Sequence, residues 1–195
     1  MIGLHPTSVM SDFKAQINEL ERISSEHKFI AIGEIGIDLY WDKTFLKEQM
    51  DAFRQQVGFA IKAELPVVVH SRDAFPEVFS VLDEFTGEKL SGVLHAFSGS
   101  VQDAEKAADM GFMLGIGGPV TYKNSELGNI VKEAGINSII LETDSPYLAP
   151  VPFRGKRNES SYIRIINKKI AEIFRISEEE SANLTFENSC RLFKI

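Results

Sequence analysis

Four residues of the kinds that bind metal ions stand at the ends of four separate apolar runs: Glu34, His70, His95 and Asp144. Each run has the length and composition of a buried strand. Because the carboxyl ends of parallel strands converge on one face of an α/β barrel, the pattern predicts that the four side chains surround one site. The chain is therefore expected to be an enzyme or part of one.

Strand-like and helix-like patterns alternate along the chain, without a repeat or a break in composition. Apolar residues at helical spacing predict helices, among them one over 46–61. This alternation favours an α/β fold with a mostly parallel sheet, and specifically a TIM-type (β/α) barrel. Strands are expected at 29–33, 67–70, 92–95, 112–116 and 138–142, after a short apolar stub at 2–4.

The length of 195 residues is short for a complete barrel of this type. Eight βα units typically need about 250 residues, and the expected strands leave the barrel short of two strands and most of a third at its amino end. We expect a single hydrolase domain over 1–195 whose barrel is incomplete through amino-terminal truncation. Strands supplied by a partner, or an open sheet, are the alternatives.

Composition limits what the chain can bind and where it works. The formal charge of −7 disfavours nonspecific attraction to nucleic acid or to a membrane, so a polyanion must be held by local cations. Cys190 is the only cysteine, which excludes an intrachain disulfide and a cysteine-based zinc framework. With no membrane-length apolar run and no secretory signal, we expect a cytoplasmic protein. No nucleotide-cofactor fingerprint is present.

The four ligand-type residues have a simpler interpretation when taken singly. A buried histidine is more often a hydrogen-bonded core residue than a metal ligand. That interpretation does not explain why all four stand at equivalent strand ends. Carboxylates and imidazoles without thiolates suit Zn²⁺, Mn²⁺ or Mg²⁺, and a pair of such ions would activate water and neutralise phosphoryl charge.

The segments around these residues resemble the signature blocks of the TatD family of metal-dependent deoxyribonucleases, in order and in approximate spacing. The resemblance covers nearly the whole chain, and five blocks in order make it specific. The blocks are Gly33-Glu34-Ile-Gly36-Ile-Asp38, Val69-His70-Ser-Arg72-Asp73-Ala74, Leu94-His95-Ala-Phe97-Ser98-Gly99, Glu142-Thr-Asp144-Ser-Pro146-Tyr147-Leu148 and Phe153-Arg154-Gly-Lys-Arg157-Asn158-Glu159.

The resemblance implies a distorted TIM barrel of the amidohydrolase superfamily that hydrolyses DNA phosphodiesters with divalent metal ions, expected as a pair. Glu34 then resembles the shared metal ligand, and His70 and His95 the ligands of one ion. Asp144 resembles the ligand of the other ion and the proton acceptor for the attacking water, so Glu34 and Asp144 are the expected catalytic residues. His5 matches a Gly-x-His-Pro block at the rim of the site. Many members carry a His-x-His pair, which this sequence lacks.

Several cations have the right positions to hold phosphate. Arg72 lies two residues after His70 and should point to the same side of its strand, although an ion pair with Asp73 or another carboxylate is an equal alternative. The stretch Arg154-Gly-Lys-Arg157-Asn158 puts cations on a loop after the Asp144 strand, and its position favours substrate binding over a merely solvated loop. The expected substrate-binding residues are His5, Arg72, Arg154, Arg157 and Asn158.

Aromatic residues Tyr40, Trp41 and Phe45 follow the Glu34 block. They could stack on a nucleobase, or they could pack as a lid over the site.

Three functional interpretations remain. The leading one is a metal-dependent deoxyribonuclease with DNA as substrate, acting on single strands or ends. The second is a small-molecule amidohydrolase, which would have no use for several phosphate-type donors. The third is a non-catalytic remnant of the fold that keeps the ligand residues without their geometry.

Overall fold

A computed structural model describes all residues from Met1 to Ile195. By its internal contacts the chain divides into two compact units, Met1–His95 with Lys194 and Ala96–Phe193 with Ile195. The expectation of a single domain stays a prediction. None of the helices combines the length and the apolar composition that a membrane span requires.

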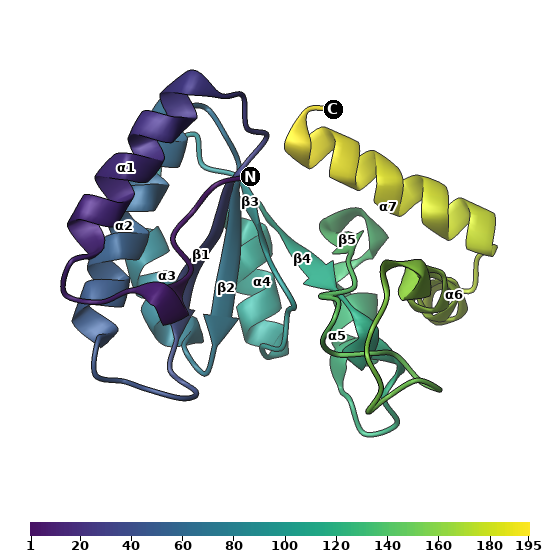
Figure 1. Cartoon of the computed structure of the whole chain (residues 1–195). Helices are drawn as coiled ribbons and strands as arrows, with labels where there is room; N and C mark the ends of the chain where they lie inside the picture. Colours follow the sequence, from purple (N-terminus) through teal and green to yellow (C-terminus); the bar gives the residue numbers. More distant parts are fainter. The chain divides into compact units, whose positions relative to one another are not determined.

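The first unit contains three strands and the helices that connect them (Figure 1). Its strands are parallel, in the order β1-β2-β3. The elements are the 3-10 turn Pro6–Ser8, α1 (Phe13–Glu26), β1 (Ile32–Asp38), α2 (Leu46–Lys62), β2 (Val67–Arg72), α3 (Phe75–Asp83) and β3 (Gly92–Leu94).

The predicted strand 29–33 is wrong in its position. β1 begins at Ile32 and continues to Asp38, whereas Phe29 and Ile30 lie outside the sheet and Ile30 is 49% exposed. The amino-terminal stub is reduced to one parallel bridge, in which Ile2 pairs with Ile32. Glu34 is therefore inside a strand and not at its end.

Helix α2 is the main support of the first unit. Its apolar residues Phe53 and Val57 are fully buried, as the helical spacing of the sequence predicts. The amino-terminal segment and α1 pack against the same helix, in a cluster of Leu4, Val9, Phe13, Ile17 and Ala52. This packing fixes the segment that carries His5.

The second unit contains two parallel strands, β4 and β5, with the helices around them (Figure 1). Its elements are α4 (Val101–Asp109), β4 (Phe112–Ile116), α5 (Leu127–Ala134), β5 (Ile139–Leu141), α6 (Ile163–Phe174) and α7 (Glu178–Phe193), with 3-10 turns at Gly118–Thr121, Ile136–Ser138 and Ser160–Tyr162.

Local signals in the sequence account for the ends of α4. Ser100 accepts the amide hydrogen of Asp103, whose carboxylate accepts the amide hydrogen of Ser100, and the two bonds form a reciprocal capping box. Gly111 follows the helix with a φ of +77°, a conformation that glycine adopts without a steric penalty.

Five strands are three fewer than the eight of a closed (β/α)₈ barrel. All pairings within each unit are parallel, and helices follow the strands. The α/β class expected from the sequence is therefore confirmed.

Candidate metal centre

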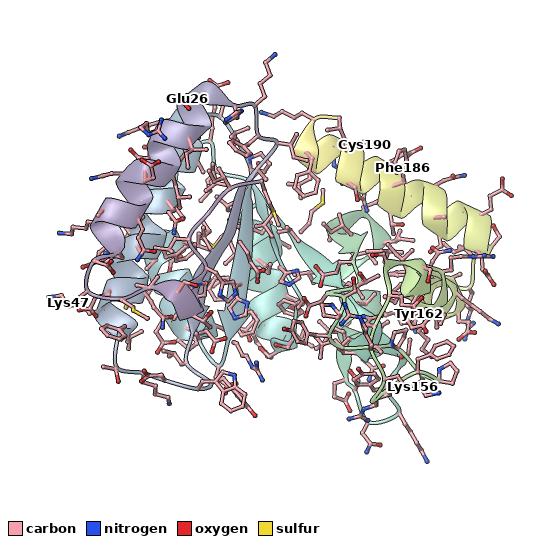
Figure 2. All side chains as sticks on the ribbon, viewed as in Figure 1. Glu26, Lys47, Lys156, Tyr162, Phe186 and Cys190 are labelled. Atoms are coloured by element: carbon pink, nitrogen blue, oxygen red, sulfur yellow. The ribbon has the colours of Figure 1, made fainter.

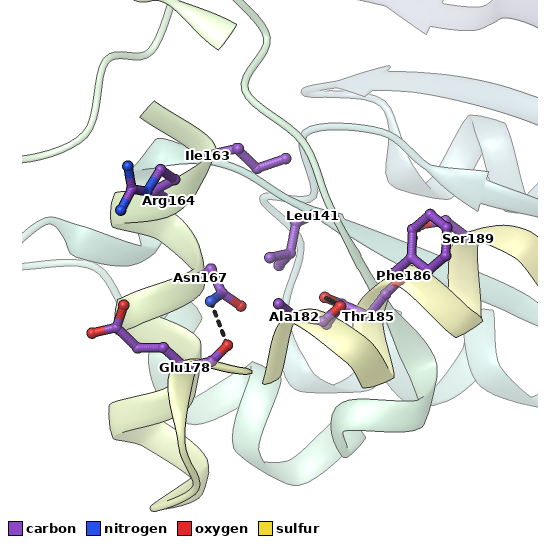
Figure 3. A pocket seen from close by; sticks show the side chains of 9 residues that line it. All are labelled: Leu141, Ile163, Arg164, Asn167, Glu178, Ala182, Thr185, Phe186 and Ser189. Carbon is purple, nitrogen blue, oxygen red and sulfur yellow. Dashed lines mark hydrogen bonds between the residues drawn. The ribbon is translucent and has the colours of Figure 1, made fainter. Parts of the chain in front are cut away.

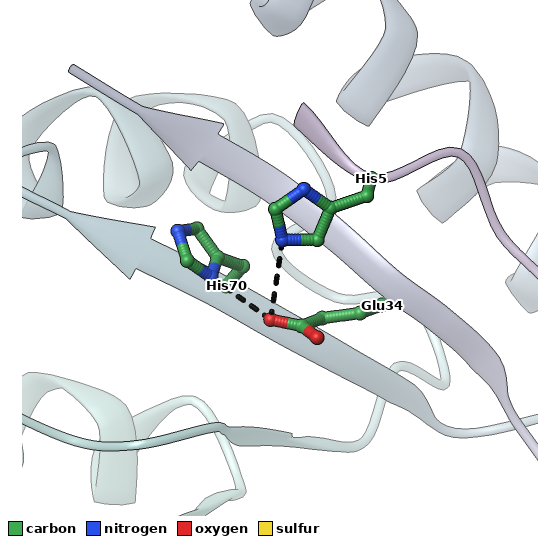
Figure 4. A group of neighbouring side chains, drawn as sticks. All are labelled: His5, Glu34 and His70. Carbon is green, nitrogen blue, oxygen red and sulfur yellow. Dashed lines mark hydrogen bonds and ion pairs between the residues drawn. The ribbon is translucent and has the colours of Figure 1, made fainter. Parts of the chain in front are cut away.

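His5, Glu34 and His70 form a compact group of potential metal ligands in the first unit (Figure 4). One ligand atom from each lies within 4.8 Å of the others. Nδ1 of His70 is 2.8 Å from Oε1 of Glu34, and Nε2 of His5 is 3.6 Å from the same oxygen. The two imidazole rings meet edge to face, with centroids 4.7 Å apart. One carboxylate oxygen is thus the centre of the group.

A bulge in β1 accompanies Glu34. Gly33 pairs with Val68 and Ile35 with Val69, so Glu34 is an extra residue between two consecutive partners on β2. Bulges of this kind redirect a side chain and are common beside active sites. Further along, Gly36 pairs with His70 at such close range that a Cβ on Gly36 would lie 2.0 Å from the His70 carbonyl oxygen. Glycine at this position permits the approach of the two strands that carry Glu34 and His70.

His95 also approaches the Glu34 carboxylate. It directly follows β3, and its amide hydrogen bonds to the Val69 carbonyl oxygen, which fixes its backbone beside β2. Its Nε2 atom is 3.7 Å from Oε1 of Glu34. Three of the four ligand-type residues predicted from the sequence are therefore brought together, and His5 joins them.

The electrostatics of the group keep Glu34 ionised. Burial favours the neutral acid, but hydrogen bonds from His5 and His70, with the charges of His95 and His70, outweigh it. Together they hold the pKa of Glu34 well below its ordinary value. An ionised carboxylate is the form that binds a cation.

Asp38 is a site residue that the sequence pattern did not reveal. Its Oδ2 atom lies 2.9 Å from Nε2 of His70, and its side chain is 5% exposed. A metal-binding histidine usually donates its second ring nitrogen to such a carboxylate, which fixes the ring's orientation and tautomer. Because Asp38 holds Nε2, the nitrogen of His70 that faces the Glu34 group is Nδ1.

Two buried glutamines on one face of α2 hold the backbone beside this group. Gln49 accepts the amide hydrogen of Asp38 at 2.8 Å and donates to the Asp38 carbonyl at 3.2 Å. Seven residues later, Gln56 makes the same pair of bonds to Leu4, next to His5. Polar residues two helical turns apart on a buried face are a signal that could have been found in the sequence.

His5 is held by the turn that it begins. Its Nδ1 accepts the Thr7 amide hydrogen at 3.2 Å and lies 2.7 Å from the Thr7 hydroxyl oxygen. With Nδ1 used as an acceptor, the neutral ring carries its hydrogen on Nε2, the atom directed at Glu34. This arrangement suits His5 to donating a hydrogen bond into the site.

Asp144 belongs to the second unit, where it lies in the loop after β5. Its backbone has a φ of +52°, and its carbonyl oxygen accepts the Tyr147 amide hydrogen at 2.8 Å. A strained, non-glycine conformation of this kind is often found at functional sites. Its predicted position beside Glu34 stays a prediction.

The predicted phosphate-binding residues have different environments. The Arg72 guanidinium lies 3.7 Å from the centroid of the Tyr40 ring, and that of Arg154 lies 4.3 Å from the Tyr122 ring. Arg157 is exposed, and so is Lys156 on the same loop (Figure 2). The charges of this loop are therefore available to a ligand, while substrate contact itself stays a prediction.

Asn158 is buried and bonds to the protein backbone. It is 2% exposed, and its side-chain amide donates to the carbonyl oxygens of Thr143 and Tyr147 at 2.6 and 2.5 Å. These bonds tie the basic loop to the loop that contains Asp144. The structure thus gives Asn158 a positioning role, and its predicted contact with substrate remains untested.

A cavity in the second unit is separate from the residues predicted to be catalytic or metal-binding. It has a volume of about 380 Å³ and lies between β5, α6 and α7 (Figure 3). Its lining is mostly apolar, and the hydrogen bond drawn there joins Asn167 to the Glu178 carbonyl. It contains none of the residues predicted to be catalytic or metal-binding.

The donor atoms of the Glu34 group fit a divalent cation. They are imidazole nitrogens and carboxylate oxygens without a thiolate, a set that Zn²⁺, Mn²⁺ and related ions accept. Asp38 supplies the outer carboxylate that such a centre normally includes. His5, Glu34 and His70 are the closely grouped ligands, and His95, with its Nε2 atom 3.7 Å from Oε1 of Glu34, would extend the set.

Comparison with known proteins agrees with this chemistry. A family model described as TatD related DNase matches residues 1–194. The metal-dependent hydrolase YabD of Bacillus subtilis, described as uncharacterized, is 40% identical over the whole chain, which covers 76% of YabD. The similarly described YcfH of Escherichia coli is 34% identical over 99% of the chain, which covers 72% of YcfH.

A solved structure has the same fold. The crystal structure of YjjV, a TatD homologue from Escherichia coli, superposes with a TM-score of 0.89 at 28% identity. The match covers all of this chain and 76% of YjjV. The chain thus spans about three quarters of the length of these relatives.

Proposed function

Because the chain belongs to the TatD-related family of metal-dependent hydrolases, we propose that it hydrolyses phosphodiester bonds of DNA, on single strands or at ends. The observation that carries the proposal is the ionised Glu34 carboxylate with three imidazoles directed at it. The family description adds DNA as the substrate.

We assign two roles to the residues: some bind a metal ion, and the others contact the substrate. Glu34, His70 and His95 would hold a divalent ion, with Asp38 fixing the ring of His70. Such an ion, or a pair of ions, supplies an activated water and neutralises negative charge on the phosphoryl oxygens. His5 donates a hydrogen bond from Nε2 toward the same centre.

Asp144 is the proposed proton acceptor. Water attacks phosphorus, the P–O bond to the leaving strand breaks, and the water proton passes to the Asp144 carboxylate. The leaving oxygen keeps the electron pair of the broken bond and takes up a proton from solvent. The half-buried position of Asp144 in its loop leaves it able to exchange that proton with solvent afterwards.

Cations favour a phosphodiester over an amide or lactone. Arg72 ends β2, the strand that carries His70, and Arg154 and Arg157 lie on the loop tied to the Asp144 loop by Asn158. In a chain with a net charge of −7, these local cations are the means of binding a polyanion. We place the protein in the cytoplasm as part of the same proposal.

The proposal is tested with end-labelled single-stranded DNA and a panel of small amides and lactones. Protein stripped with a chelator should cleave neither, and added Mg²⁺, Mn²⁺ or Zn²⁺ should restore cleavage of DNA in preference to the small substrates. Turnover of an amide without DNA cleavage would replace the nuclease by an amidohydrolase. Inactivity on every substrate with metal bound would indicate a non-catalytic remnant.

A further inference from the structure

The first unit also contains a cavity, which lies beside the candidate metal centre. Its volume is about 160 Å³, and its walls include Pro6, Trp41 and Phe45. We propose that this cavity binds an unpaired nucleobase of the DNA strand, stacked on the indole ring of Trp41. The proposal rests on the proposed function, because it names the part of the substrate that enters this cavity.

The cavity adjoins the Glu34 group at two points. Pro6 follows His5, whose Nε2 atom lies 3.6 Å from Glu34. Asp38 also lines the cavity, and its carboxylate bonds to His70. A base in the cavity therefore places its own nucleotide close to the residues proposed to act on the phosphodiester.

Trp41 is unusually exposed for its size. Its side chain is 78% exposed, and that of its neighbour Tyr40 is 49% exposed. A large aromatic ring in water forfeits the apolar burial that it normally gains, so exposed aromatics beside a cavity mark contact sites. Stacking between an aromatic ring and a base tolerates any sequence, because every base has a π-face.

Contacts on the loop hold this pair of rings in place. Tyr40 and Trp41 meet edge to face with centroids 4.6 Å apart, and the Arg72 guanidinium lies over the Tyr40 ring. The Tyr40 amide donates to Asp38, which connects the aromatic loop to the carboxylate behind His70. The Tyr40–Trp41 pair is therefore attached to Asp38, the residue that also bonds to His70.

The negative charge of the cavity lining favours a base over a phosphate as its occupant. Asp38 and Asp42 line the cavity, and their negative charges repel a phosphate. The exposed Asp42 carboxylate can accept a hydrogen bond from an amino or imino group of a base. Arg72 is not part of the cavity lining, and it is the nearby cation that suits a phosphate. The base is thus assigned to the cavity and the phosphate to Arg72, at the end of β2.

The test uses the fluorescence of Trp41, which is the only tryptophan of the chain. The whole protein in EDTA, which prevents cleavage, is titrated with a single-stranded oligonucleotide and with an abasic strand of equal length and equal phosphate number. Fluorescein anisotropy measures binding of both strands. We expect the base-bearing strand to change Trp41 emission and to bind more tightly, while the abasic strand binds without that change.

Substitutions separate stacking from folding. Trp41→Ala should weaken binding of the base-bearing strand by about 5- to 150-fold, as expected for the loss of one base–aromatic stack, and should leave the abasic strand unaffected. Trp41→Phe should restore most of the affinity. Phe186→Ala removes a similarly exposed aromatic from α7, where the side chain is 67% exposed, and should change neither strand's binding.

Two outcomes would overturn the inference and leave the proposed function intact. One is an equal Trp41 signal from both strands, and the other is an equal loss of affinity for both strands in Trp41→Ala, which would make the ring a lid or a phosphate neighbour. If the wild-type protein binds neither strand and cleaves no DNA with metal, the proposed function fails and this inference fails with it.

Discussion

The two units of the chain carry different kinds of predicted site residue. In the first, Glu34, His70 and His95 are brought together by strands and the turn after a strand, with direct side-chain contacts. In the second, Asp144, Arg154 and Arg157 lie on loops held by backbone bonds and by the buried amide of Asn158. Rigid strands suit the fixed geometry of a metal centre, whereas loops suit residues that contact a substrate.

The largest expected effect separates turnover from metal binding. Asp144→Ala should lower kcat for DNA cleavage by about 10²–10⁴-fold, because the reaction loses its proton acceptor. Binding of an ion to the Glu34 group should persist, and stability against urea should change little, because Asp144 is only half buried. Single-turnover kinetics and calorimetric metal titration measure the two quantities. Normal cleavage by this variant would remove Asp144 from the mechanism.

Glu34→Gln should have the converse effect on the first unit. It replaces the central carboxylate by a neutral amide, so metal affinity should fall by more than the roughly 100-fold upper range for an outer partner. Cleavage should fall with it. Glu88→Gln removes an exposed carboxylate of the same unit and is the matched control. Equal metal affinity in both variants would show that the ion binds elsewhere.

Asp38→Asn should act through His70. The substitution keeps the side chain's size but weakens the hold on Nε2 of His70, and loss of such an outer carboxylate typically costs about 10–100-fold in metal affinity or activity. The Gln49 bonds join the Asp38 backbone and survive the change, so the metal-free protein should melt near the wild-type temperature. Asp12→Asn, at an exposed site, is the control. An unchanged metal titration would limit Asp38 to a structural role.

The smallest effect concerns the loop cations. Replacing Arg154 and Arg157 with alanine should weaken DNA binding and flatten its dependence on salt, because fewer counterions are released when the strand binds. The slope should fall by about 0.7 for each phosphate of a single strand that no longer meets a cation. Lys132→Ala with Lys168→Ala removes the same charge from exposed helix positions. If both double variants change the slope equally, the loop contributes only net charge.

The sequence predicts the class of fold and most of the candidate metal centre, for identifiable reasons. His70 and His95 follow short apolar runs that lie in β2 and β3, so their convergence follows from parallel pairing. The prediction of Glu34 as a strand-end residue is partly wrong, because Glu34 lies inside β1. The run at 29–33 is apolar, but the strand begins at Ile32 and contains two glycines that weaken its strand signal.

Other features could not be predicted because their partners are remote in sequence. Asp38 contacts a ring nitrogen of a residue 32 positions away, and no spacing rule connects them. The bulge at Glu34 depends on the register between two strands, which composition does not specify. The glutamines of α2 were detectable as polar residues on a buried face, although the backbone groups that they hold were not.

The central claim is that the Glu34 group is a metal centre, and anomalous X-ray diffraction from crystals grown with Zn²⁺ or Mn²⁺ tests it most directly. We predict an anomalous peak that marks a metal ion bound to a Glu34 carboxylate oxygen, to Nδ1 of His70 and to Nε2 of His95. The Asp38 carboxylate should still be hydrogen-bonded to Nε2 of His70. A fully occupied metal at another position, with Glu34 keeping its hydrogen bonds to His5 and His70, would contradict the claim.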